Sequence, residues 1–214
     1  EYPIYFGHNT GANIATHLLE WCHDLGIKTL TVYVLSTENL QRPQKELDGL
    51  FEAIREKLQE LINDDRLRRY KVRVKGIGRL ELLPQKIRNL LAELEESTSN
   101  FEGHFLNLAL AYGGRTEIVD VVKKIVAKCE SGDVKVDEIT QETVETHLYT
   151  AHLSNPDPDL IIRTSGEERL SGFLLWQSAY SELIFLDVYW PDFRKIDLMR
   201  AIRTYQQRAR RFGS

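Results

Sequence analysis

Short apolar runs rich in β-branched and aromatic residues alternate with helical patterns along this chain, and this alternation constrains the fold most strongly. Strands alternating with helices favour an α/β fold with a mostly parallel central sheet flanked by helices. No linker or internal repeat stands out, so we expect one domain over residues 1–214. The predicted strands are 28–36, 70–78, 104–113, 159–164 and 182–190, and the predicted helices are 13–26, 42–64, 83–98, 115–130, 140–153 and 191–213.

Composition narrows the class of protein. The formal net charge of −4 argues against a general nucleic-acid binder, which would usually be basic, so we expect no nucleic-acid partner. Cys22 and Cys129 stand in no CxxC pair, which indicates two reduced thiols and a reducing compartment. No apolar run approaches the roughly 20 residues needed to cross a bilayer, and no signal peptide is visible. A cytoplasmic location is therefore expected.

Polar, glycine-bearing segments follow several predicted strands, where ligands bind in parallel α/β sheets. After the strand at 159–164, the segment "RTSGEERLS" offers Arg163, Arg169 and Ser171 within nine residues. Guanidinium groups match phosphate oxygens, so this segment is a candidate site for a phosphate or diphosphate. The alternative is a solvated loop whose arginines pair with Glu167 and Glu168, and composition alone leaves both open.

Two further segments repeat the pattern. "STENLQRP" (36–43) supplies hydrogen-bonding groups at a strand end, although plain capping of the helix from 43 is the alternative. "FGHNTG" (6–11) leads into the first predicted helix and places His8 where a helix N-terminus would accept an anion. Glu182 begins the last predicted strand and becomes a candidate Mg²⁺ ligand only if a diphosphate is bound beside it.

Several enzyme classes lose support because their motifs are absent. The chain contains no HExxH, GxxxxGK[ST], GxGxxG or GxSxG sequence. Metalloproteases, P-loop nucleotide hydrolases, dinucleotide enzymes and α/β-hydrolases normally carry these motifs. The strand-end segments therefore need another explanation.

Five segments together resemble the cis-prenyltransferases, the undecaprenyl and dehydrodolichyl diphosphate synthase family. They are "GHNTG", "LTVYVLSTENLQRP", "NLALAYGGRTEI", "RTSGEERLSGFLLWQSAYSELIFLDVYWPDF" and "RRFG", and they span residues 6 to 213 in the family's order. The resemblance implies a parallel sheet flanked by helices with an apolar tunnel. It also implies Mg²⁺-dependent condensation of isopentenyl diphosphate onto an allylic diphosphate, such as farnesyl or geranylgeranyl diphosphate, giving a long polyprenyl diphosphate.

The resemblance assigns a role to each matching residue. It implies that Asn39 is linked to proton removal and that Glu182 binds Mg²⁺. It further implies a homodimer that contacts the membrane peripherally during product release. The residues assigned to isopentenyl diphosphate are Arg163, Arg169, Ser171, Arg211 and Gly213. The last two belong to a C-terminal Arg-x-Gly that, by the resemblance, completes the partner's site. The residues assigned to the allylic substrate are His8, Ser36, Thr37, Glu38 and Arg42.

The tunnel would be walled by two helices. Candidate wall residues, whose alternative is ordinary core, are Leu18, Leu19 and Trp21 in the first predicted helix and Leu50, Phe51 and Ile54 in the second. The sequence departs from the family at Leu40, where several members carry an aromatic residue, near Ile4, where they carry a basic one, and above all in the first strand. The family's first strand, with its Asp-Gly-Asn loop and metal-binding Asp, has no counterpart here, so we expect the domain to lack that strand and loop.

Two rival functions remain. A non-catalytic partner subunit of a heteromeric cis-prenyltransferase would share the fold, but such chains usually lose the arginine-serine segment that this chain keeps. A generic phosphate-binding protein would explain "RTSGEERLS" but not the basic tail "RARRFG" at 208–213.

Overall fold

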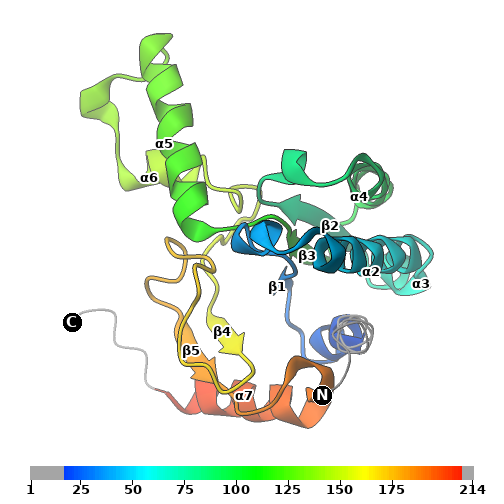
Figure 1. Cartoon of the computed structure of the whole chain (residues 1–214). Coiled ribbons are helices and arrows are strands. Elements are labelled where there is room, and N and C mark those ends of the chain that lie inside the picture. Colours follow the sequence, from blue (N-terminus) through cyan, green and yellow to red (C-terminus); the bar gives the residue numbers. More distant parts are fainter. Residues whose placement is uncertain (1–16, 209–214) are drawn as a thin grey trace.

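A computed structural model of the chain describes residues 17–208, and all five predicted strands are confirmed at shorter lengths. The strands form two separate groups, and paired strands within each group run parallel (Figure 1). A three-stranded sheet has the order β1-β3-β2, and a separate pair joins β4 to β5. The bounds are Thr29–Tyr33 for β1, Val72–Ile77 for β2, His104–Ala109 for β3, Leu160–Arg163 for β4 and Glu182–Phe185 for β5.

Within residues 17–208, four long helices form where the apolar periodicity predicts them. They are α2 (Gln44–Ile62), α4 (Gln85–Thr98), α5 (Gly114–Glu130) and α7 (Lys195–Gln207), and residues 17–24 are also helical. The shorter helices are α3 (Asp65–Arg69) and α6 (Gln141–Glu145), with 3₁₀ turns η1 (Glu38–Gln41), η2 (Leu80–Leu82), η3 (Val136–Glu138) and η4 (Trp190–Asp192).

The helix predicted over 140–153 is wrong beyond its first turns. Thr140 caps α6 by accepting a hydrogen bond from the Thr143 N–H, but α6 ends at Glu145. Beyond it, Leu148 is buried, and the N–H of Tyr149 donates to Glu117 of α5. These tertiary contacts replace the helical hydrogen bonds that the periodicity predicts.

One face of the three-stranded sheet carries the main hydrophobic core. Val72 and Val74 of β2 and Leu106 of β3 are buried in a cluster with side chains of α2 and α4. In Figure 1, α2 and α4 lie together on this side of the strands. The buried members of α2 and α4 in the cluster are Leu50, Ile54, Leu58, Ile87, Leu91 and Leu94.

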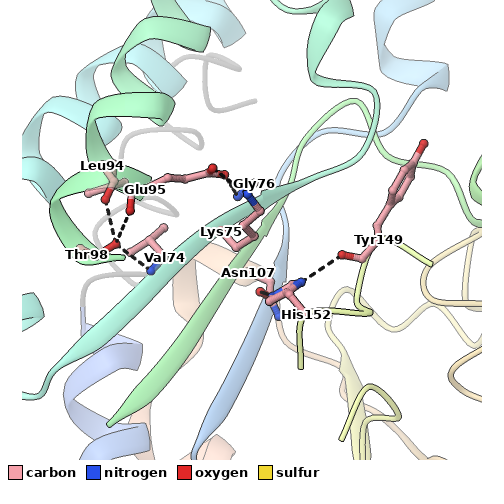
Figure 2. A network of polar contacts seen from close by, with 9 residues as sticks. All are labelled: Val74, Lys75, Gly76, Leu94, Glu95, Thr98, Asn107, Tyr149 and His152. Atoms are coloured by element: carbon pink, nitrogen blue, oxygen red, sulfur yellow. Dashed lines mark hydrogen bonds and ion pairs between the residues drawn. The ribbon is translucent and has the colours of Figure 1, made fainter. Parts of the chain in front are cut away.

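The outer edge of β2 is closed by side chains of α4 (Figure 2). The hydroxyl oxygen of Thr98 accepts a hydrogen bond from the Val74 N–H at 3.1 Å. The Glu95 carboxylate accepts from the Gly76 N–H at 2.7 Å and from Nζ of Lys75 at 2.8 Å. Because unpaired N–H groups on a strand edge invite another strand, these contacts end the sheet at β2.

Candidate active site

A cavity of about 1690 Å³ runs alongside β1. At one end it is lined by Lys28, before the strand, and at the other by Ser36, after it. Its walls are largely apolar, and four of the six predicted wall residues line it: Leu18, Leu19, Leu50 and Ile54. The other two, Trp21 and Phe51, pack in neighbouring hydrophobic clusters instead.

The segment after β4 lines the polar end of this cavity. Nη1 of Arg163 donates to the carbonyl oxygen of Arg169 at 2.5 Å and to Oγ of Ser171 at 2.6 Å. Ser165 and Gly166 adopt φ values of 77° and 69°, which lets the chain turn sharply. All three predicted residues, Arg163, Arg169 and Ser171, are thus brought together.

The structure agrees in part with each interpretation of this segment, the anion site and the solvated loop. Arg169 pairs with Glu167 at 2.5 Å, as expected for a solvated loop, and its side chain is 66% exposed. Arg163 instead spans the loop, and within residues 17–208 its Nε and Nη2 make no hydrogen bond. A guanidinium with donors left over, at the mouth of a cavity, can still bind an anion.

The segment after β1 forms the facing side of the polar end. The Ser36 N–H donates to Oδ1 of Asn39 at 3.0 Å, and the Asn39 N–H donates back to Oγ of Ser36 at 3.1 Å. These bonds close the turn that leads into η1. α2 begins after Pro43 without a side-chain cap, so the alternative explanation of this segment, plain capping of that helix, does not hold. Glu38 also lines the cavity.

Two predicted residues of this segment are placed differently. The Thr37 N–H donates to the carbonyl oxygen of Tyr112 at 3.0 Å, and neither Thr37 nor Arg42 is among the residues that line the cavity. Arg42 is exposed just before α2. His8, Arg211 and Gly213 lie outside the described residues.

An aromatic group beside the polar end was missed by the sequence analysis. The ring of Tyr33 stacks on Phe173 at 4.9 Å and meets the edge of Tyr112 at 5.8 Å. Burial raises the pKa of Tyr33 to about 12, and the nearby Glu38 carboxylate adds to the rise. The available signal was position: Tyr33 ends β1, and Phe173 follows the "RLSG" turn.

Glu182 is not brought to this end of the cavity. Its register partner is Leu160, whereas Arg163 pairs with Phe185, so Glu182 and Arg163 lie at opposite ends of the β4–β5 pair, about 10 Å apart. Oε2 of Glu182 accepts from Nη1 of Arg208 at 2.7 Å. Across residues 17–208 no group of three or more His, Cys, Asp or Glu side chains could hold a metal ion.

The described residues therefore do not by themselves form a Mg²⁺ site. Mg²⁺ usually takes one or two carboxylates together with substrate phosphates, and here the one predicted carboxylate is engaged by an arginine. We derive no step of the reaction through the metal.

A strand end that carries guanidinium and hydroxyl groups, joined to a long apolar cavity, defines an α/β protein whose site has one polar and one apolar part. Residues 2–213 match the prenyltransferase family model described as "Putative undecaprenyl diphosphate synthase". The chain belongs to this family of cis-prenyltransferases.

Close relatives and solved structures agree with this placement. The chain is 54% identical over 207 residues to the tritrans,polycis-undecaprenyl-diphosphate synthase (geranylgeranyl-diphosphate specific) of Methanopyrus kandleri, covering 97% of this chain and 76% of the relative. It is 51% identical over 209 residues to the enzyme of the same name from Methanocaldococcus jannaschii, covering 98% and 75%. The lavandulyl diphosphate synthase of Lavandula x intermedia, solved with dimethylallyl diphosphate, matches with a TM-score of 0.96 at 36% identity over 99% of this chain and 90% of that one.

Proposed function

We propose that this protein condenses isopentenyl diphosphate with an allylic diphosphate to make a cis-polyprenyl diphosphate. The observation that carries the proposal is that one continuous cavity joins the Arg163–Ser171 segment to a wall of leucine and isoleucine side chains. A growing product has a charged head and a lengthening hydrocarbon tail, and this cavity offers a matching surface to each. Geranylgeranyl diphosphate is the proposed primer, since the archaeal relatives are named for that specificity.

The proposed reaction assigns the two strand-end segments to the two substrates. Arg163, Arg169 and Ser171 bind the diphosphate of isopentenyl diphosphate, and Ser36 and Glu38 lie beside the allylic substrate. The bond between allylic C1 and its diphosphate oxygen breaks, and C4 of isopentenyl diphosphate bonds to C1. A proton then leaves C2 for the released diphosphate, and the side chain of Asn39, which lines this side of the cavity, orients the groups that transfer it. Holding both substrates in register supplies much of the acceleration.

Mg²⁺ belongs to the proposal because members of this family generally require it. Glu182 remains a proposed ligand, and its ion pair with Arg208 would have to open for a cation to bind.

A homodimer is also proposed, and α5 supports it. Val119, Val122 and Val126 follow helical spacing on the outer face of α5 and are 48%, 53% and 49% exposed. The inner face is already buried through Val121 and Ile125. A surface helix that is apolar on two faces usually packs against a second partner, and an isologous dimer would cover the outer face. Sedimentation of Val122→Glu, which should be monomeric, tests this assignment.

An additional parallel strand between β1 and β4 is the last part of the proposal. β1 pairs only with β3, and β4 only with β5, among residues 17–208. Since Lys28 and Val34 bond toward β3, alternation along the strand directs the N–H and C=O groups of Thr29, Thr31 and Tyr33 away from β3. The cavity lies between these two edges, and no side chain caps them as Glu95 and Thr98 cap β2 within the described part of the chain. A strand from outside residues 17–208 would join the two groups into one sheet.

Incorporation of radiolabelled isopentenyl diphosphate tests the activity directly. The natural full-length protein is incubated with Mg²⁺ and geranylgeranyl or farnesyl diphosphate, and products are resolved by chain length. We expect long products with an allylic primer, none without it, and loss of incorporation with EDTA. Failure with both primers would favour the non-catalytic partner subunit, which should then bind isopentenyl diphosphate without converting it.

A further inference from the structure

The turn between β3 and α5 contacts both substrate segments. The carbonyl oxygen of Tyr112 accepts hydrogen bonds from the Thr37 N–H at 3.0 Å and from the Tyr33 hydroxyl at 3.2 Å. Two residues later, the N–H of Gly114 donates to the carbonyl oxygen of Gly172 at 2.7 Å, directly after Ser171. One short turn therefore lies between the proposed allylic segment and the proposed isopentenyl diphosphate segment.

The two glycines of this turn allow the close approach on each side. A Cβ on Gly113 would lie 2.7 Å from Oγ1 of Thr37, and a Cβ on Gly114 would lie 2.6 Å from the carbonyl oxygen of Gly172. The carbonyl oxygen of Gly172 is backbone, so Gly114 has no room for a side chain, whereas the Thr37 hydroxyl beside Gly113 can rotate. The separation of the two segments is therefore set by the backbone of the turn.

A buried carboxylate one turn into α5 holds this turn in place. The Tyr112 hydroxyl donates to Oε2 of Glu117, and both side chains are almost fully buried. Oε1 of Glu117 accepts from the Tyr149 N–H at 2.7 Å and from Nε2 of Gln177 at 3.1 Å. No ion pair to Glu117 is found among residues 17–208, so its charge is stabilised by these three donors.

We propose that Glu117 is a positioning residue for prenyl transfer, acting through Tyr112 to fix the separation of the two diphosphate-binding segments. The inference rests on the proposed function, since it takes those segments to be the two substrate sites. Displacing one reactant by about 1 Å can cost on the order of 100-fold in rate without loss of binding. Glu117 should therefore govern kcat more than the affinity for either substrate.

Glu117→Gln and Tyr112→Phe test the proposal. Glutamine keeps one acceptor oxygen where the carboxylate offers two, so the three donors can no longer all be satisfied. Tyr112→Phe removes only the hydroxyl contact and serves if Glu117→Gln folds poorly. We expect kcat to fall about 10-fold or more while the Kd of each substrate, measured alone by calorimetry, changes less than about threefold. Equal weakening of both Kd values, or an unchanged kcat, would overturn the proposal.

Glu95→Gln is the matched control, because Glu95 is also a helix carboxylate that accepts a backbone N–H, from Gly76 of the edge strand β2 (Figure 2). It should leave kcat unchanged. Amide hydrogen exchange gives a readout independent of activity: the Thr37 and Gly114 N–H groups should exchange faster in Glu117→Gln and not in Glu95→Gln. If the wild-type protein incorporates no isopentenyl diphosphate, the proposed function fails, and hydrogen exchange still decides whether Glu117 holds the two segments. Unchanged exchange at both amides would refute the positioning role.

Discussion

The two strand-end segments of the site reach their shapes by different means. Residues 36–42 are closed mainly by their own side chains, since Ser36 and Asn39 exchange hydrogen bonds across a single 3₁₀ turn, with one outside anchor from Thr37 to Tyr112. Residues 163–172 are also held by other parts of the chain, because the N–H groups of Ser165 and Gly166 donate to the carbonyl oxygens of Val188 and Leu186. The backbone of this segment passes through positive φ at four positions. Those positions are Ser165, Gly166, Ser171 and Gly172.

The segment at 36–42 is therefore ordered mainly by its own residues, whereas the segment at 163–172 depends more on contacts with other parts of the chain. A turn closed by neighbours should tolerate changes elsewhere, whereas a loop in sparsely populated backbone conformations persists only if its surroundings hold it. Mutations of residues that contact the loop at 163–172 directly, as Gly114 does, should therefore damage isopentenyl diphosphate binding more than allylic binding.

Arg163→Ala should have the largest effect. It removes both bonds that span the loop and the positive charge at the end of β4, and hydrogen bonds to charged groups contribute about 1.5–3 kcal/mol each. We expect the KM for isopentenyl diphosphate to rise about 100-fold in steady-state kinetics, with a smaller rise for Arg169→Ala, whose guanidinium is exposed. Arg68→Ala, an exposed change in α3, is the control; if it matches Arg163→Ala, the assignment of Arg163 is refuted.

Gly114→Ala should have the second-largest effect, because its Cβ would lie 2.6 Å from the carbonyl oxygen of Gly172. The loop at 163–172 must move, so we expect the KM for isopentenyl diphosphate to rise about 10-fold while that for the allylic primer changes little. Gly49→Ala is the matched control, since a Cβ there meets nothing within 4 Å. Calorimetric unfolding should show Gly49→Ala stabilised by about 0.5–1 kcal/mol. Equal changes in both KM values for Gly114→Ala would contradict the comparison.

Asn39→Ala and Ser36→Ala separate local capping from chemistry in the other segment. Each removes one of the two reciprocal bonds, and loss of such a cap costs about 1 kcal/mol. If Asn39 also takes part in proton removal, Asn39→Ala should lower kcat about 10-fold beyond Ser36→Ala. Equal kcat values for the two variants would restrict Asn39 to a structural role.

Lowering the pH should have the smallest effect of the four changes, and it should destabilise only the segment at residues 36–42. A hydrogen bond from its own backbone N–H lowers the pKa of Glu38, and the hydroxyls of Ser36 and Thr37 lower it further. Because the folded pKa lies below the unfolded value, this stabilisation is present above the unfolded pKa and is lost as pH falls through the folded pKa. NMR titration should find the Glu38 pKa lowered and Ser36→Ala should raise it, whereas the Arg163 contacts should not respond to acid.

Much of the fold could be predicted because its signals are local. Alternating periodicity located the five strands and the long helices, and the strand-end motifs gathered Ser36, Asn39, Arg163, Arg169 and Ser171 around one cavity. The short helix α6 and the aromatic group around Tyr33 could not be predicted. In both cases contacts between residues far apart in the chain, such as Tyr149 with Glu117, override or create the local structure.

The sequence by itself determined the family, the order of elements and the chemical character of the strand-end segments, because residue type and spacing along one strand carry that information. Only the tertiary structure decided which of these residues meet. Parallel register placed Glu182 at the end of β5 away from Arg163, although the motif had joined them, and the turn at Tyr112–Gly114 set the gap between the two substrate segments. Strand register and the closeness of backbone packing are set by residues far apart in the chain, so no local sequence pattern encodes them.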